Sequence, residues 1–224
     1  MKLIRFKLFV CLVILIAALS FSSCHRDPPI EDPTIALTFD DGPDSLYTLQ
    51  ILDILKAKNV KATFFLTGSH IRRYPLVVKR IVEEGHSAGN HTYSHLYIST
   101  SSDSLVNSEV ATTQHLIDSI CGSNPKLFRA PWGAITDEQV QRLRQQGYKH
   151  VSWNIDTRDF ESTSEEIVKF VMEHHQDKGI VLMHSADYSD RQSRAETVKA
   201  LPQIIDRLRS EYHYRFVRVE ELLK

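Results

Sequence analysis

The sequence has little cysteine, no excess of either charge, and no apolar run as long as a typical membrane-spanning helix. Its 224 residues include three cysteines, and 27 Lys and Arg residues nearly balance 28 Asp and Glu residues, for a formal net charge of −1. This balance speaks against a nucleic-acid-binding protein, which usually carries a basic excess or patch. Beyond Cys24 only Cys121 remains, so the rest of the chain cannot form an internal disulfide.

The N-terminus has the pattern of an export signal. A basic head precedes an apolar run that ends near Leu19, which is shorter than the roughly 20 residues of a spanning helix and fits a secretory signal. The small residues before Cys24 resemble a bacterial lipoprotein signal, although Phe21 stands where an aliphatic residue is usual. We expect a signal peptide at residues 1–23, lipid on Cys24, and export to the cell envelope on a bacterial membrane. Plain secretion and an uncleaved anchor are the alternatives.

A single folded domain is expected to follow a short tether. Residues 24–33 are polar and contain three prolines, which predicts a stiff linker, and the domain is expected at residues 34–224. There, short apolar runs alternate about seven times with amphipathic stretches. The runs predict strands at residues 35–39, 62–66, 86–88, 127–129, 150–155, 180–183 and 216–219, and the stretches predict helices at residues 45–58, 75–84, 104–120, 137–146, 163–175 and 194–210. This alternation predicts an α/β fold with parallel strands and outer helices, as a barrel or an open sheet.

The chemically reactive side chains follow the predicted strands. In α/β barrels the active site lies at the carboxyl ends of the strands, so side chains from separate strands are expected to meet at one face. The residues in question are Asp40, Asp41, His91, Arg129, Asp156, Asp159 and His184.

Three of these residues form a candidate metal site. His91 and His95 are four residues apart, a spacing that places two imidazoles on one side of a helical turn, as in many zinc sites. Alone, such a pair more often lies on an exposed helix face, and Asp40-Asp41 could equally cap a turn. Together, one of these carboxylates and two histidines make a three-ligand site with open positions. The same ligands suit Fe(II) in an oxygenase, which is a rival interpretation.

Two further residues favour hydrolysis over oxygen chemistry. The aspartate that does not bind the metal could accept a proton from a water molecule. His184 could protonate a leaving amine, because the unperturbed pKa of histidine lies near neutrality.

Five motifs in the same order closely resemble those of the polysaccharide deacetylases, carbohydrate esterase family 4. They are TFDDGP at residues 38–43, HTYSH at 91–95, RAPWG at 129–133, DTRDF at 156–160 and LMH at 182–184. The resemblance covers nearly all of the chain from about residue 35. Phe160 departs from it, because the fourth motif usually ends in tryptophan, and the change removes an indole N–H donor from the groove.

The resemblance implies a single distorted (β/α)7 barrel and a divalent metal, most often Zn²⁺, with Co²⁺ and Ni²⁺ suited to the same ligands. It also implies roles for most of the site residues. The metal ligands would be Asp41, His91 and His95, the general base Asp40 and the general acid His184. Arg129 would lie beside Asp40, Asp159 (or else Asp156) beside His184, the Trp132 N–H at the oxyanion, and Leu182 at the acetyl methyl. Tyr93 and Phe160 are expected to contact the substrate.

The predicted function is therefore metal-dependent removal of N-acetyl groups from glycans that contain N-acetylglucosamine, such as peptidoglycan or chitooligosaccharides. An O-acetyl esterase acting on xylan and a non-enzymatic glycan-binding relative are the alternatives. The expected partners are the glycan and, through the lipid, a membrane; neither nucleic acid nor a required protein partner is inferred.

Overall fold

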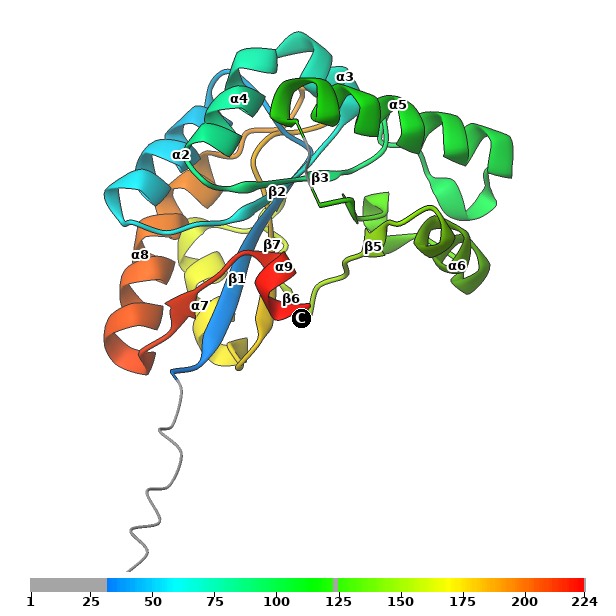
Figure 1. The fold of residues 1–224 in the computed structure, drawn as a ribbon. Helices are drawn as coiled ribbons and strands as arrows, with labels where there is room; N and C mark the ends of the chain where they lie inside the picture. The colour runs from blue at the N-terminus through cyan, green and yellow to red at the C-terminus, as the bar shows by residue number, and fades with distance from the viewer. Residues whose placement is uncertain (1–31, 123–124, 224) are drawn as a thin grey trace, which may run out of the picture. The chain divides into compact units, whose positions relative to one another are not determined.

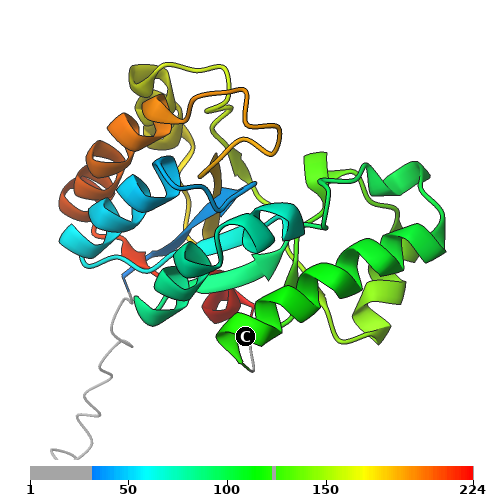
Figure 2. The same cartoon turned by 90° about the horizontal axis from the view of Figure 1, so that it is seen from above.

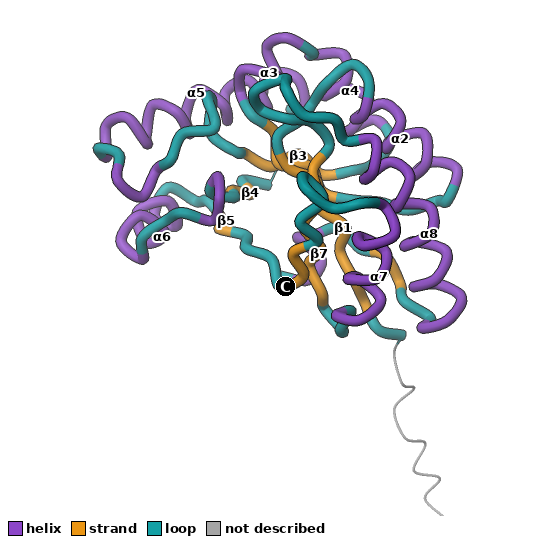
Figure 3. The backbone as a smooth tube through the Cα atoms, turned by 180° about the vertical axis from the view of Figure 1, so that it is seen from behind, coloured by secondary structure: helices purple, strands orange, loops and turns teal. Residues whose placement is uncertain are grey.

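A curled parallel sheet lies at the centre of the computed structural model, which describes residues 32–122 and 125–223 (Figures 1 and 3). The strand order is β5-β4-β3-β2-β1-β7-β6, with β8 beside β1. The strands are β1 (Thr34–Asp40), β2 (Thr63–Leu66), β3 (Ser87–Asn90), β4 (Leu127–Phe128), β5 (Lys149–His150), β6 (Ile155–Asp156), β7 (Gly179–His184) and β8 (Arg215–Phe216). All pairings are parallel, which confirms the predicted α/β class with a barrel-like sheet.

The helices cover the outer face of this sheet (Figure 2). Around that face α7, α8, α2, α4 and α5 each pack on the next. The helices are α2 (Tyr47–Ala57), α3 (Gly68–Arg73), α4 (Pro75–Glu83), α5 (Asp103–Cys121), α6 (Asp137–Gln145), α7 (Ser164–His174), α8 (Ala195–Tyr212) and α9 (Val219–Leu222), with short 3-10 turns η1 (Ile98–Thr100) and η2 (Pro131–Gly133). No helix in the described ranges is long and apolar enough to cross a membrane.

The start of the domain can be compared with the prediction, but the N-terminal signal cannot. Strand β1 begins at Thr34, where the folded domain is expected to begin. The predicted signal peptide, Cys24 and the tether up to Glu31 lie outside the described residues.

The side chains of β1 point alternately into the hydrophobic core and towards the concave side of the sheet. Ile35, Leu37 and Phe39 are buried in the large cluster under the outer helices. The intervening residues face the other side of the sheet, because successive side chains of a strand point to opposite faces. Thr38 and Asp40 therefore lie on the concave side, so β1 supplies polar groups there while it holds the helices on its outer face.

The predicted strand at residues 150–155 is wrong. The segment instead forms β5 at one edge of the sheet and β6 at the other, with residues 151–154 between them. The buried Arg129 side chain explains the break, because its Nε and Nη2 donate to the carbonyls of Val151 and Ser152 at 3.3 and 3.2 Å. Those carbonyls are thereby satisfied by a side chain, and the segment passes from β4 to β7 without a continuous ladder.

Two short elements also differ from the prediction. Helix α3 is missed because its six residues, GSHIRR, contain too few apolar positions to show a helical period. The predicted final strand at residues 216–219 is confined to β8. Val219 already belongs to α9, the terminal helical turn that the sequence predicts after this strand, and its N–H donates to Thr63 Oγ1. The start of α3 contacts the loop between His91 and His95, because the N–H groups of Gly68 and Ser69 donate to the carbonyls of Thr92 and Tyr93, both at 2.9 Å.

Candidate active site

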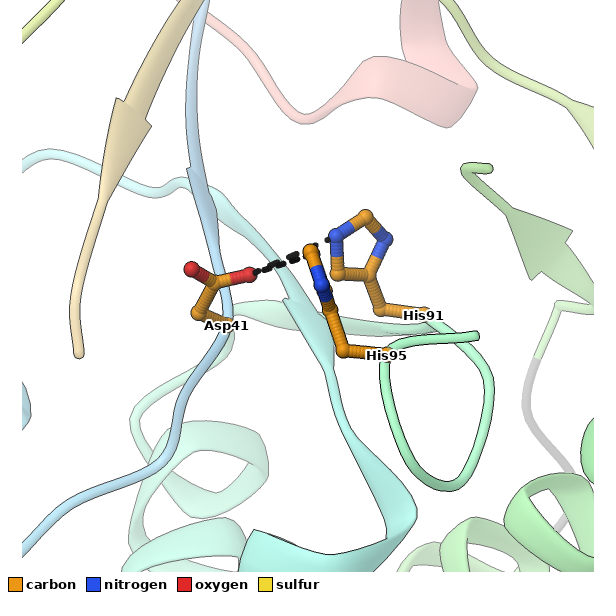
Figure 4. Close-up of side chains that lie close together, drawn as sticks. All are labelled: Asp41, His91 and His95. Atoms are coloured by element: carbon orange, nitrogen blue, oxygen red, sulfur yellow. Dashed lines mark ion pairs between the residues drawn. The ribbon is translucent and has the colours of Figure 1, made fainter. Parts of the chain in front are cut away.

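Asp41, His91 and His95 converge at the carboxyl ends of β1 and β3 (Figure 4). Asp41 Oδ1 lies 3.2 Å from His95 Nε2 and 3.5 Å from His91 Nε2. All three side chains are buried, and among the described residues they form the one group of three His, Cys, Asp or Glu side chains close enough together to share an ion. The structure therefore brings together the three residues expected to bind metal.

The polar atoms of this cluster fit a cation. His91 Nδ1 lies 2.8 Å from the carbonyl oxygen of Arg129, which can only accept, so Nδ1 carries the proton and Nε2 presents a lone pair. Asp41 Oδ1 is buried and has no hydrogen-bond partner among the described residues. A carboxylate facing two imidazole nitrogens is a donor set that suits a divalent ion.

Several residues at the site have a left-handed backbone conformation, which determines the direction of their side chains. Asp41, Thr92, His95 and Trp132 have φ angles of 71°, 64°, 58° and 55°, values that favour glycine over other residues. At Asp41 the turn overrides strand alternation, and His91 Nε2 lies within 3.7 Å of both Asp40 Oδ2 and Asp41 Oδ1. Such conformations persist only where the surrounding structure holds them, and they gather at functional sites.

Hydrogen bonds to neighbouring elements hold the loop of the two histidines. Glu109 on α5 accepts from the N–H groups of Tyr93 and Ser94, both at 2.8 Å. Asn90 accepts from the Thr92 N–H, and Thr92 Oγ1 accepts from the Leu96 N–H. The imidazole of His95 stacks on the Tyr188 ring, with 4.0 Å between centroids.

Asp40 is fixed by a buried ion pair. Arg129 is fully buried, and its Nη1 donates to Asp40 Oδ1 and to Thr38 Oγ1, both at 2.8 Å. Burial lowers the pKa of the Arg129 guanidinium although Asp40 opposes the effect. Arg129 therefore sets the orientation of the Asp40 carboxylate on the concave face of β1.

His184 stands next to Asp40 on the neighbouring strand. The two are register partners in the β1–β7 ladder, so both reach the same end of the sheet. Asp159 Oδ1 lies 2.6 Å from His184 Nδ1, and Asp159 Oδ2 accepts from Thr197 Oγ1 at 2.6 Å. Burial opposes charge on His184, but Asp159 outweighs it, with Asp41 and Asp40 contributing, and the pKa of His184 rises to about 9. Of the two aspartates considered beside His184, Asp159 makes this contact.

A pocket of about 390 Å³ joins these groups. That size lies in the range of small-molecule sites. Of the residues predicted from the sequence, it is lined by Asp40, Asp41, His91, His95, Trp132, Asp156, Phe160, Leu182 and His184. Arg129 and Asp159 lie behind this lining and contact Asp40 and His184.

Tyr93 is not among the residues that line the pocket, so its expected contact with substrate stays a prediction. A Cβ atom placed on Gly68 would lie 2.5 Å from Tyr93 Cδ2, so the tyrosine ring occupies the space above the start of α3.

Three aromatic residues at or near the pocket are not indicated by the motifs. Trp153 and Tyr188 line it, and Tyr97 lies next to Trp132 with 5.5 Å between ring centroids. Trp153 reads from the sequence as a core residue, and Tyr97 and Tyr188 lie in loops without a recognisable pattern. Tyr97 and Tyr188 stand out because their side chains stay exposed after the chain folds, which the sequence alone does not show.

Comparison with known proteins identifies the family. The family model described as polysaccharide deacetylase matches residues 27–151. The chain belongs to the polysaccharide deacetylase family. A peptidoglycan-N-acetylglucosamine deacetylase of Bacillus cereus is 39% identical over 199 residues, covering 88% of this chain and 91% of that protein. A chitooligosaccharide deacetylase of a Bradyrhizobium strain is 34% identical over 184 residues, covering 78% of this chain and 84% of its own.

A solved polysaccharide deacetylase structure has the same fold. It is a peptidoglycan N-acetylglucosamine deacetylase in complex with 4-naphthalen-1-yl-N-oxidanyl-benzamide, with a TM-score of 0.81 and 35% sequence identity. The alignment covers 87% of this chain and 89% of that one. The match confirms the barrel-like fold and the family resemblance drawn from the five motifs.

Proposed function

We propose that this protein is a hydrolase that removes N-acetyl groups from N-acetylglucosamine units of a glycan. The supporting observation is that Asp40 and His184, partners across β1 and β7, line the same pocket as the Asp41–His91–His95 cluster. A proton acceptor and a proton donor thus flank a candidate metal site within one cavity. This arrangement suits the hydrolysis of an amide, which needs both proton transfers.

Asp41, His91 and His95 are proposed to hold a divalent cation, with Zn²⁺ favoured by the nitrogen and oxygen donors. When bound, such a cation supplies Lewis acidity that polarises the acetamide carbonyl and lowers the pKa of a water molecule. Tyr188 and Trp132 pack on the His95 ring and restrict its rotation, so the ligand geometry is held before the ion binds.

The remaining residues are proposed to transfer protons and to stabilise the charge that develops during the reaction. Asp40, oriented by Arg129, accepts a proton from the attacking water as its oxygen bonds to the carbonyl carbon. The Trp132 N–H donates to the oxyanion of the tetrahedral intermediate. His184, oriented by Asp159, gives its proton to the nitrogen as the C–N bond breaks, so that acetate and the free amine are the products. Leu182 and Phe160 supply apolar surface for the acetyl group and the sugar.

The glycan is proposed to be peptidoglycan or a related chain of N-acetylglucosamine. Both named relatives remove acetyl groups from such polymers, one from peptidoglycan and the other from chitooligosaccharides. Acetate release should be measured side by side on peptidoglycan, chitotetraose and acetylated xylan, with and without added Zn²⁺. We expect release from the first two substrates. Release from xylan alone would indicate the O-acetyl esterase, and no release from any glycan would indicate a non-enzymatic relative.

Asp40→Asn provides the sharpest test of the site. The substitution keeps the shape but removes the proton acceptor, so acetate release is expected to fall by about 100-fold or more, the usual contribution of a general base. Zn²⁺ content after dialysis, measured by mass spectrometry, should stay at the wild-type level, whereas His91→Ala should lose both metal and activity. Asp137→Asn, at an exposed carboxylate on α6, is the matched control and should leave activity unchanged. Wild-type activity in Asp40→Asn would overturn the assignment of the base.

We also propose that the protein is exported and held at the cell envelope by lipid on Cys24. Support comes from the sequence before Cys24 and from the cell-wall polymer named for the relative from Bacillus cereus. Fractionation of cells that express wild type and Cys24→Ala tests the proposal. Wild type is expected in the membrane fraction and the variant outside it, and equal membrane retention would contradict lipidation.

A further inference from the structure

The exposed aromatic side chains of the described residues gather at one place. Within residues 32–122 and 125–223, eight large hydrophobic side chains are exposed, and the four aromatic ones among them lie at or beside the pocket. They are Tyr97, Trp132, Phe160 and Tyr188, with between 42% and 53% of each exposed. The remaining four are leucines outside the pocket lining. Exposed apolar patches with polar surroundings commonly mark binding surfaces.

Three of these rings form a continuous surface, here called the aromatic ridge and consisting of Tyr97, Trp132 and Tyr188. Trp132 lies 5.8 Å from Tyr188 and 5.5 Å from Tyr97 between ring centroids. Trp132 and Tyr188 line the pocket, whereas Tyr97 is not part of the lining. The ridge therefore continues from the pocket wall to surface outside the pocket.

The backbone at Tyr97 is held firmly, so the exposure of its ring is built into the fold. On one side the Leu96 N–H donates to Thr92 Oγ1 at 3.0 Å. On the other side Ile98 is fully buried, and its carbonyl accepts from Gln139 Nε2 at 2.7 Å. The Tyr97 carbonyl accepts from Ser101 Oγ at 2.8 Å. Because this backbone is already ordered, covering the ring with a ligand costs little further backbone entropy.

We propose that Tyr97, together with the outer part of Trp132, binds the sugar next to the one that is deacetylated. This inference rests on the proposed function. A pyranose ring presents a face of C–H groups, and an aromatic ring can cover that face and gain dispersion energy while the hydroxyl groups at the edge remain hydrated. Because the ridge begins in the pocket and ends at Tyr97, a glycan with one unit in the pocket places a neighbouring unit over Tyr97. The enzyme accordingly favours chains over single acetylated groups.

Two substrates of different size test the proposal with Tyr97→Ala. Chitotetraose reaches beyond the pocket, whereas 4-nitrophenyl acetate fits within it, and activity seen in Asp40→Asn is subtracted from both. We expect kcat/KM for chitotetraose to fall about tenfold, mostly through KM, because the lost contact binds substrate and transition state alike. The value for 4-nitrophenyl acetate should stay unchanged, and Tyr97→Phe should restore activity on the tetramer.

Leu76→Ala is the matched control, because Leu76 on α4 is also exposed and lies outside the pocket lining. It should leave both substrates unaffected. Equal losses on both substrates in Tyr97→Ala would indicate a structural effect, and an unchanged tetramer rate would show that no sugar contacts Tyr97; either result overturns the inference. Failure of the wild type to release acetate from any glycan would instead overturn the proposed function, so the two failures are distinguishable.

Discussion

Asp40 and Asp41 show how one residue's backbone conformation decides its chemistry. Two neighbours in an extended strand point to opposite faces, and one of them would then be lost to the outer helices. The left-handed φ of 71° at Asp41 turns the chain, so both carboxylates reach the same cavity. Asp40 is then held by Arg129, while Asp41 Oδ1 has no hydrogen-bond partner in the described part of the chain and is open to a cation.

The pH dependence of activity should report the contact between Asp159 and His184. Asp159→Asn removes the charge that stabilises the imidazolium, so the pKa of His184 falls from about 9. His184 then loses its proton at lower pH, and the alkaline limb of kcat/KM is expected to move down by about one pH unit or more. Rates on chitotetraose between pH 6 and pH 10 provide the measurement.

Thr197→Val is the control for this shift. Thr197 donates to Asp159 Oδ2, and its loss weakens the contact but leaves the carboxylate charge in place. A smaller shift in the same direction is expected. An alkaline limb that stays in place in Asp159→Asn would mean that another group sets it.

At the scale of elements, segment 149–156 shows how a side chain can interrupt a strand. The apolar residues at 150–155 predict one strand. Arg129 instead donates to two backbone carbonyls of this segment, and β5 and β6 lie at opposite edges of the sheet. The same arginine orients Asp40. The interruption of the strand and the orientation of the Asp40 carboxylate therefore depend on the same side chain.

Helix α7 allows a test of local stability that should leave the site intact. Thr163 Oγ1 accepts from the Glu166 N–H, and Glu166 Oε2 accepts from the Thr163 N–H, which together form a capping box. Thr163→Ala removes the side-chain acceptor and is expected to lower the free energy of unfolding by about 1 kcal/mol. Urea unfolding followed by circular dichroism measures the loss, and activity on chitotetraose should not change.

Thr112→Ala is the comparison for this change. Thr112 is exposed within α5, where alanine is the better helix former, so stability should stay level or rise slightly. Equal effects of the two substitutions would argue against a stabilising cap at Thr163.

At the scale of the whole molecule, a buried histidine links folding to pH. His86 is 4% exposed, and its Nδ1 accepts from the Ala62 N–H at 3.1 Å. Burial lowers its pKa to about 4, with Lys61 adding to the effect. The unfolded chain binds this proton near pH 6.5, so the stability due to neutral His86 is complete above that value and is lost as the pH falls towards 4.

His86→Asn should flatten that dependence, because asparagine keeps an acceptor for Ala62 and does not titrate. The wild type is expected to lose up to about 3 kcal/mol more than the variant between pH 6.5 and pH 4. Urea midpoints at several pH values, compared as slopes, separate this effect from any constant loss due to the smaller side chain. Parallel slopes for the two proteins would refute it.

Much of the site could be predicted because its reactive residues lie in short sequence motifs. The motifs at residues 38–43, 91–95 and 182–184 place Asp41, His91, His95, Asp40 and His184 at strand ends, and parallel strands bring those ends to one face. That face exists in any fold with this alternation, so the cluster could be expected before its geometry was known. The position of Tyr93 outside the pocket lining could not be predicted, because the left-handed turn at Thr92 is not visible in the order of residues.

What the sequence by itself determined is the set of reactive groups, their family and the α/β alternation that assembles them. What only the tertiary structure decided is which residues surround those groups. The contact of Asp159 with His184, the break in residues 150–155 and the aromatic ridge each depend on side chains from distant segments. Hydrophobic periodicity and motif order are local properties of a chain, whereas such contacts arise only when the sheet curls and its loops meet at one end.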